Sequence, residues 1–177
     1  MQPVVEGQLP MKLDKLDIAL IRLMVEEPRA GGREYARLLG VARGTVQSRI
    51  GRLERAGVVR PNITLVGARP LGFPVEAFVH LQLAQGKLDE VTARLVAIPE
   101  VLHAHTTTGE GDMLCRVVAE TNEHLEQIVQ QLLALPGVVR TRTEVAMSER
   151  IPYRVLPLLM MLHRKSQEES GARGRGN

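Results

Sequence analysis

The segment 34–59 limits the possible folds of this chain most strongly, because two helical patterns meet there at a tight corner. The first pattern covers residues 35–39, the corner falls at Gly40 and Val41, and a longer pattern covers residues 43–56. Two helices joined in this way are the sequence form of a helix-turn-helix. The rest of the chain has to position this segment.

The longer pattern spaces Val46, Ile50 and Leu53 by four and three residues, which makes one narrow apolar stripe on a helix. The side opposite the stripe and its flanks hold basic, polar and glycine residues: Arg43, Gly44, Thr45, Gln47, Ser48, Arg49, Gly51, Arg52 and Arg55. Their charges share one sign and the glycines allow a close approach of the backbone. This surface therefore suits a phosphate-lined groove better than a protein partner.

Charge is divided unevenly along the chain. Residues 29–60 contain eight arginines and two glutamates, a net charge of +6, although the whole chain carries +3. Residues 76–150 contain six basic and eleven acidic residues, a net charge of −5. A basic region beside an acidic one is expected when one domain binds nucleic acid and the other does not. Arginines on an isolated helix are usually only solvated, but here the corner, the stripe and the charge coincide, which favours DNA binding.

The composition narrows the class of ligand. The chain has four aromatic residues besides histidine, Tyr35, Phe73, Phe78 and Tyr153, which argues against recognition of single strands by base stacking and favours duplex DNA. The single Cys115 lies in an apolar run, where a packed thiol is expected. One cysteine excludes a disulfide framework or a zinc cluster within one chain, and we expect neither a metal nor a cofactor.

No segment predicts export or membrane insertion. The N-terminus lacks a basic region followed by an apolar core, and the apolar run 155–162 is short and interrupted by Pro157. We expect a soluble, cytoplasmic, nucleoid-associated protein without a membrane partner.

The remaining patterns predict two domains and their connections. Residues 1–10 are expected to be a flexible extension, and residues 11–60 a helix-turn-helix (winged-helix-like) domain of three helices. Prolines and glycines mark residues 61–75 as a linker that combines a short strand at 63–66 with a hinge. Residues 76–158 form the second domain, and residues 159–177 a C-terminal tail whose end is expected to be disordered.

The second domain alternates strand and helix patterns in the order βαββαβ. The predicted elements are strands at 77–83, 101–108, 113–120 and 138–147 and helices at 88–98 and 122–135. This order predicts a ferredoxin-like α+β fold, in which helices cover one face of the sheet. The other face, partly apolar, needs a cover, for which we expect the same sheet of a second chain in a homodimer.

Ordered motifs occur in both domains. The first domain contains Leu13-Asp14-Lys15-Leu16-Asp17, Arg29, Ala36, Leu39-Gly40, Val46, Arg49-Ile50, Arg52-Leu53-Glu54 and Gly57-Val58. The second contains Leu71-Gly72, Thr108-Gly109, Asp112, Leu135-Pro136-Gly137-Val138 and Thr141-Arg142-Thr143. Over residues 11–158 this pattern resembles the Lrp/AsnC (leucine-responsive and asparagine-responsive, feast/famine) family of transcriptional regulators. The resemblance implies a DNA-binding regulator that dimerises, that can join four dimers into an octamer, and that responds to a small effector such as an amino acid.

Two residues depart from the family pattern. Ala42 stands where the family usually has a serine, which removes a side-chain N-cap from the recognition helix. Gly51 stands where lysine or arginine is common, at a cost to the helix of about 1 kcal/mol. Both departures bear on which operator sequence is read.

The helix-turn-helix predicts the residues that contact DNA. Candidates for base edges lie near the start of the second helix: Arg43, Thr45, Gln47 and Ser48. Arg52 and Arg55 are placed for phosphates, whereas Arg49 lies close to the apolar stripe, so a structural ion pair is as well supported there as a DNA contact. A symmetric dimer would read half-sites about 34 Å or a multiple apart, and its operator would be an imperfect palindrome.

A glycine-rich turn is the candidate effector site. It consists of Thr108, Gly109, Glu110, Gly111 and Asp112. Its glycines would expose backbone N–H groups to a carboxylate and Asp112 would face an α-amino group, between neighbouring chains, with Thr141 and Thr143 nearby. The alternative is a simple β-turn, for which glycine and aspartate are the usual residues; only the family resemblance favours effector binding.

Two alternatives to an effector-controlled regulator remain. His103 and His105 alternate along a strand and share one face, a spacing that could hold a metal or serve acid–base chemistry. Siroheme decarboxylases, which resemble this family, use histidines and aromatics catalytically, but aromatics are scarce here, and we expect no catalytic residue. In the other alternative, the second domain is an assembly module without an effector.

Overall fold

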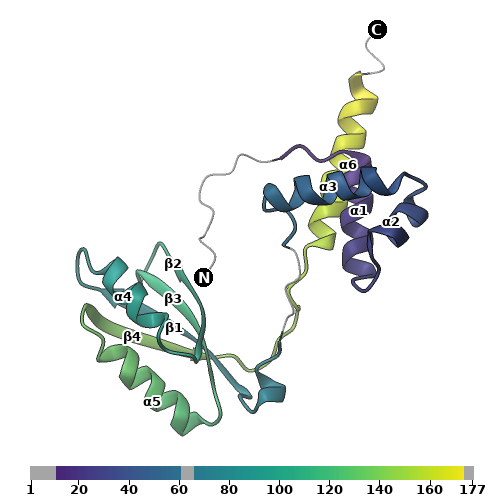
Figure 1. Ribbon diagram of the computed structural model, residues 1–177. Coiled ribbons are helices and arrows are strands. Elements are labelled where there is room, and N and C mark those ends of the chain that lie inside the picture. Colours follow the sequence, from purple (N-terminus) through teal and green to yellow (C-terminus); the bar gives the residue numbers. More distant parts are fainter. Residues whose placement is uncertain (1–10, 61–65, 174–177) are drawn as a thin grey trace. The chain divides into compact units, whose positions relative to one another are not determined.

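The computed structural model describes residues 11–60 and 66–173. The chain divides into two compact units: a head, made of Met1–Thr64 together with Ile151–Asn177, and a sheet domain, made of Leu65–Arg150. Figure 1 shows helices in the described part of the head and a sheet covered by helices in the sheet domain. The predicted extension at 1–10 and most of the predicted strand at 63–66 lie outside the described residues.

The head contains the predicted helix-turn-helix. Its first three helices are α1 (Lys15–Glu26), α2 (Gly32–Leu39) and α3 (Arg43–Arg55). A capping box, in which Asp14 and Asp17 each accept the other's backbone N–H, starts α1. Gly40 ends α2 with a φ of 64°, a left-handed conformation that glycine adopts without strain. The chain can therefore turn sharply into α3.

A fourth helix, α6 (Leu156–Arg173), belongs to the head. Leu159 is 4% exposed and joins the core formed by α1, α2 and α3, and Leu156 packs against the same core. This differs from the predicted boundary, which assigned 76–158 to the second domain and expected disorder toward the end of 159–177. The apolar start of α6 completes the head core, and the helix continues to Arg173; residues 174–177 lie outside the described part.

The sheet domain has the predicted βαββαβ order and confirms the ferredoxin-like fold. Its elements are β1 (Val75–Leu83), α4 (Leu88–Leu95), β2 (Val101–Thr106), β3 (Met113–Ala119), α5 (Asn122–Leu133) and β4 (Val138–Val145). The strands are antiparallel in the order β2-β3-β1-β4. Before β1, the described part of the linker, residues 66–74, contains a 3₁₀ turn, Arg69–Leu71.

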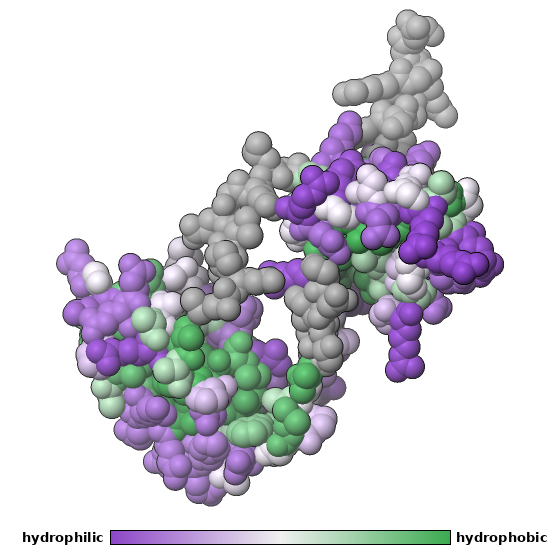
Figure 2. Space-filling view, viewed as in Figure 1, coloured by the Kyte–Doolittle hydropathy of each residue, from purple (hydrophilic) through white to green (hydrophobic). Residues whose placement is uncertain are grey.

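The two faces of the sheet differ in chemistry. Alternate residues of β1 and β3, such as Val79 and Cys115, are fully buried with Val91 of α4 and Leu132 of α5. The other face carries the intervening side chains, and these are more charged than expected: Arg116 pairs with Glu76 at 2.6 Å, and Arg142 pairs with Glu144 on β4. Large apolar side chains still reach the surface of this unit, and Figure 2 shows them as green areas. None of the described helices is long and apolar enough to cross a membrane.

Candidate nucleic-acid interface and effector site

Helix α3 presents the predicted polar face to solvent. Val46 and Leu53 are 1% and 0% exposed and fix the helix to the head core. Six of the seven predicted DNA contacts are exposed: Arg43, Thr45, Gln47, Ser48, Arg52 and Arg55. The seventh, Arg49, is partly buried. The helix has no acidic residue in its first turn, so it offers cations and hydroxyl groups to a partner.

Two glycines open this face further. A Cβ atom built on Gly44 or Gly51 would meet nothing within 4 Å, so neither glycine is required by packing. Each leaves the α3 backbone accessible from solvent, so the wall of a DNA groove can approach the backbone closely. The N-cap residue, Ala42, makes no side-chain hydrogen bond to the helix, as its sequence predicts.

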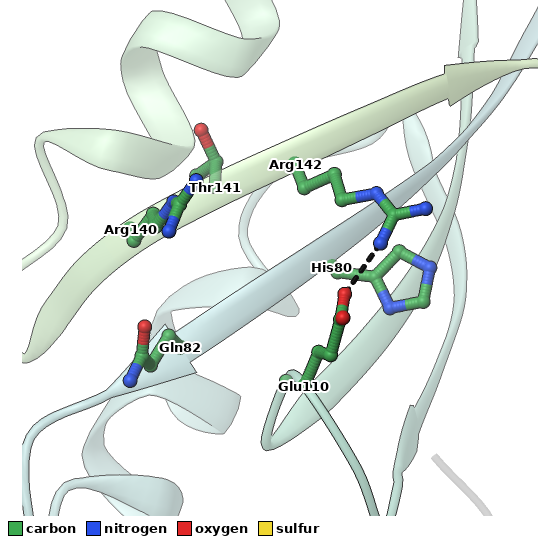
Figure 3. Close-up of a pocket in the computed structure, with 7 residues that line it drawn as sticks. His80, Gln82, Glu110, Arg140, Thr141 and Arg142 are labelled. Carbon is green, nitrogen blue, oxygen red and sulfur yellow. Dashed lines mark hydrogen bonds and ion pairs between the residues drawn. The ribbon is translucent and has the colours of Figure 1, made fainter.

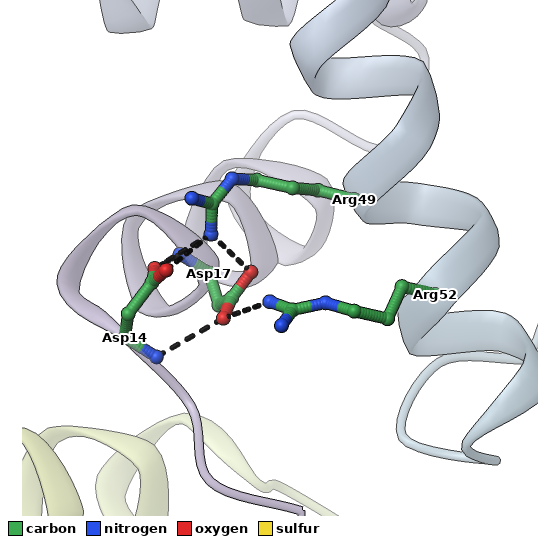
Figure 4. A network of polar contacts seen from close by, with 4 residues as sticks. All are labelled: Asp14, Asp17, Arg49 and Arg52. Atoms are coloured by element: carbon green, nitrogen blue, oxygen red, sulfur yellow. Dashed lines mark hydrogen bonds and ion pairs between the residues drawn. The ribbon is translucent and has the colours of Figure 1, made fainter.

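Arg49 takes part in an ion-pair network with α1 (Figure 4). One of its terminal nitrogens donates to Asp14 Oδ2 at 2.6 Å and to Asp17 Oδ1 at 2.7 Å. These bonds raise the pKa of the Arg49 guanidinium, the bond to Asp14 most. Of its two candidate roles, the structure supports the structural ion pair for Arg49.

The other arginines of α3 have different surroundings. Arg52 donates from Nη2 to Asp17 Oδ2, yet 45% of its side chain is exposed. Arg55 Nε donates to the carbonyl oxygen of Gly51 at 3.0 Å, a bond within the helix that leaves Arg55 on the outer face. Both arginines can present N–H groups to a phosphate.

The glycine-rich turn is held firmly to the sheet. Gly109 has a φ of 128°, which L side chains rarely adopt. Asp112 Oδ2 accepts the backbone N–H of Leu83 at 2.6 Å, and the Asp112 N–H donates to the carbonyl of Leu81 at 2.9 Å. Thr107 Oγ1 donates to the carbonyl oxygen of Gly111 at 2.9 Å. Asp112 therefore has a structural role in the turn, which supports the β-turn alternative for this residue.

A cavity of about 410 Å³ lies beside the turn, at the charged face of the sheet (Figure 3). It is lined by His80, Gln82, Glu110, Gly111, Arg140, Thr141 and Arg142. Figure 3 shows Glu110 and Arg142 reaching toward each other beside the His80 ring, and their side chains pair at 2.5 Å. Arg142 also donates to Glu144 at 2.6 Å. The cavity thus offers both a cationic and an anionic group at its wall.

The predicted effector residues do not all lie at one cavity. Glu110, Gly111 and Thr141 line this cavity, whereas Asp112 lines a second one of about 330 Å³ beside residues 83–88. Thr108, Gly109 and Thr143 line neither of the two. Thr143 lies opposite the buried Val79 in the register of β4 and β1.

Four cavity residues were missed by sequence reasoning: His80, Gln82, Arg140 and Arg142. In the register of β1 with β4, His80 lies opposite Arg142 and Gln82 opposite Arg140. The alternation along β1 places His80 and Gln82 on one side of the strand, but the strand to which they are paired follows only from the fold.

The candidate catalytic and redox residues lie elsewhere. The rings of His103 and His105 on β2 are 4.1 Å apart between centroids. Among the described residues, no group of three or more histidine, cysteine, aspartate or glutamate side chains could hold a metal. Cys115 is fully buried, and burial raises the pKa of its thiol to about 11, so it packs as an apolar group.

Comparison with protein families matches both units. Residues 13–54 match the AsnC-type helix-turn-helix domain, and residues 76–156 match the Lrp/AsnC ligand binding domain. The HTH-type transcriptional regulator FL11 of Pyrococcus abyssi is 28% identical over 148 residues, which cover 84% of this chain and 98% of the relative. An uncharacterized HTH-type transcriptional regulator of the same organism is 30% identical over 139 residues, covering 78% and 88%.

Solved structures share the fold. E. coli AsnC superposes with a TM-score of 0.76 at 21% identity, covering 83% of this chain and 100% of AsnC. A transcriptional regulator from Neisseria meningitidis, solved as a complex with L-Met, gives a TM-score of 0.71 at 25% identity and covers 83% of this chain and 99% of its own.

Proposed function

Because this chain belongs to the Lrp/AsnC family of helix-turn-helix transcriptional regulators, we propose that it reads an operator in duplex DNA with α3 and that a small effector changes this binding. The observation that carries the proposal is the exposed face of α3, where basic and hydroxyl side chains surround two open glycines. Phosphate contacts give affinity and base contacts give specificity. Arg52 and Arg55 would contact phosphates and give affinity. The polar residues near the start of α3 would contact base edges and give specificity.

The pairing of two heads is part of the proposal. Two copies related by a two-fold axis would read an imperfect palindrome, with half-sites one helical turn or a multiple apart. We propose a homodimer, with assembly to an octamer through the sheet domain. The protein then acts on the nucleoid in the cytoplasm as a regulator and not as an enzyme; a haem-type absorption band in the purified protein would contradict this.

Salt dependence tests the DNA contact. Binding of a labelled duplex by the full-length protein should weaken steeply with salt, and the same sequence as a single strand should bind less tightly. Arg55→Ala should reduce the slope of log affinity against log salt by about one, because one phosphate contact is lost. The matched control is Arg22→Ala on α1, whose side chain pairs with Glu26 and should leave the slope unchanged. If Arg55→Ala also leaves it unchanged, Arg55 does not contact DNA.

For the effector, we propose an amino acid bound in the cavity beside Glu110 and Arg142. The L-Met complex of the Neisseria regulator supports an amino acid as the class of ligand. A guanidinium can bind the α-carboxylate and a carboxylate the α-ammonium group, so a zwitterion can replace the existing ion pair with two charge-assisted contacts. The proposed effector contacts are therefore Glu110 and Arg142, whereas Asp112 stabilises the turn.

A thermal-shift screen of the twenty amino acids tests this site. A ligand that raises the melting temperature of the wild type should raise that of Arg142→Ala much less. Arg94→Ala on α4 removes the same charge from an exposed pair with Glu90 and should keep the full shift. If no amino acid binds at millimolar concentration, the sheet domain is an assembly module alone.

A further inference from the structure

Asp17 is a buried charge in an unusual place. It lies in the first turn of α1, its side chain is 0% exposed, and both carboxylate oxygens accept hydrogen bonds. The partners are the backbone N–H of Asp14 and the guanidinium groups of Arg49 and Arg52. Burying a carboxylate is costly unless such partners are supplied. Both charged partners come from the recognition helix, so the carboxylate links α1 to that helix.

The two arginines have different degrees of exposure. The Arg49 side chain is 24% exposed and bonds to both Asp14 and Asp17. The Arg52 side chain is 45% exposed and bonds through a single nitrogen to Asp17. A guanidinium has five N–H donors in a fixed plane. Arg52 therefore has donors left for a ligand, and its bond to the buried carboxylate restrains the position of its guanidinium.

Arg52 lies beside the exposed face of α3, although its side chain extends toward Asp17 of α1 (Figure 4). On a helix, Arg52 follows Ser48 by one turn, and Ser48 is exposed on the face opposite Val46 and Leu53. A phosphate that contacts this face would meet the free edge of a guanidinium held in position. Fixing a long side chain before binding reduces the entropy lost on binding.

We infer that Asp17 is a positioning residue for DNA recognition: it holds Arg52 as a preformed phosphate clamp, while Arg49 anchors the helix. The inference rests on the proposed binding of duplex DNA by α3. Asp17 thus contributes to binding although it is buried and does not itself contact DNA. The expected gain in affinity is up to about tenfold, the size that one immobilised side chain can provide.

A double-mutant cycle separates this role from a structural one. Full-length wild type, Asp17→Asn, Arg52→Ala and the double variant would be titrated with a fixed 30-base-pair duplex at several salt concentrations. Asp17→Asn removes a negative charge from the head, and by charge alone it should strengthen binding. We expect it instead to weaken binding up to about tenfold with an unchanged salt slope, since Arg52 keeps its charge. In the Arg52→Ala background, the same substitution should not weaken binding.

The matched control is Asp14→Asn. It removes the same charge from the same network, but Asp14 bonds to Arg49 and not to Arg52, so affinity should stay the same or rise. Equal effects of Asp17→Asn and Asp14→Asn, or an equal loss in both Arg52 backgrounds, would overturn the inference. Circular dichroism of each variant reports whether the head is folded.

A second variant covers the case in which Asp17→Asn does not fold. Arg52→Lys keeps the charge on an exposed position but lacks the planar fork that two partners can share. We expect weaker binding at an unchanged salt slope, and an affinity equal to that of the wild type would overturn the inference. If the wild type itself fails to bind the duplex at low salt, the proposed function fails as well, which is a different outcome from loss of coupling alone.

Discussion

Ala42 starts the recognition helix without capping it. Its backbone has the extended conformation of an N-cap, but its side chain accepts no hydrogen bond from the first turn. We expect Ala42→Ser to raise the free energy of unfolding by about 1 kcal/mol, because a hydroxyl oxygen can accept one of the unpaired N–H groups. Urea unfolding of the two proteins measures the difference. A stability equal to that of the wild type would show that the serine side chain does not cap α3.

The ionisation of Asp14 makes the stability of the head depend on pH in the acidic range. Burial opposes its ionisation, but the hydrogen bond from Arg49 and backbone bonds outweigh this, and the pKa of the carboxyl lies below its ordinary value. A lowered folded pKa stabilises the head above the unfolded pKa of roughly 3.9, and this contribution is lost as the pH falls through the folded pKa. Asp14→Asn keeps a capping side chain but loses the charge.

We therefore expect wild type and Asp14→Asn to differ in stability at pH 6 and to converge as the pH falls toward 2.5. Urea unfolding at a series of pH values is the measurement. A difference that stays constant over this range would mean that the charge of Asp14 does not stabilise the head.

At the scale of elements, α6 is a structural part of the head. Leu159 is 4% exposed within the head core, whereas its neighbour Leu158 is 54% exposed. Leu159→Ala should destabilise the head by about 2–5 kcal/mol, as large-to-small changes in a core do. Leu158→Ala should cost under about 1 kcal/mol. Hydrogen exchange of the amides in α1 and α3 reports the head alone, and equal protection in the two variants would contradict the docking of α6.

Local sequence patterns explain why the elements could be predicted. The spacing of Val46 and Leu53 fixes the buried side of α3, and alternation in β1 separates Val79 from His80, because both depend only on the periods of helix and strand. The order of these patterns then gave the fold class. The uncovered face of the sheet predicted a dimer, and the resemblance to the family added assembly beyond the dimer and effector binding, which no local pattern contains.

The contacts between distant elements could not be predicted from local patterns. Asp17 and Arg52 are 35 residues apart, and sequence reasoning assigned Arg52 to a phosphate without its carboxylate partner. Arg142 meets Glu110 only because β4 pairs with β1 beside the turn. The docking of α6 onto the head likewise depends on where the chain returns after the sheet domain. Each of these requires the tertiary fold.

In the whole molecule, the charge separation follows the two units. The basic segment forms the helix-turn-helix, and the acidic segment forms the sheet domain with its cavity. A positive head attracts the phosphate backbone and a negative sheet domain is repelled by it. In the proposed function, the effector and the operator bind different units of one chain, and assembly of several chains links the two binding events.

Selection of bound duplexes from a random library tests the central claim most directly. The full-length protein should enrich an imperfect palindrome whose half-sites are about 10 base pairs, or a multiple of this, apart. Ser48→Ala and Gln47→Ala, which change exposed side chains near the start of α3, should enrich sequences that differ within the half-sites and keep the same spacing. The account would be contradicted if the wild type enriched no sequence, or if these variants enriched the wild-type operator unchanged.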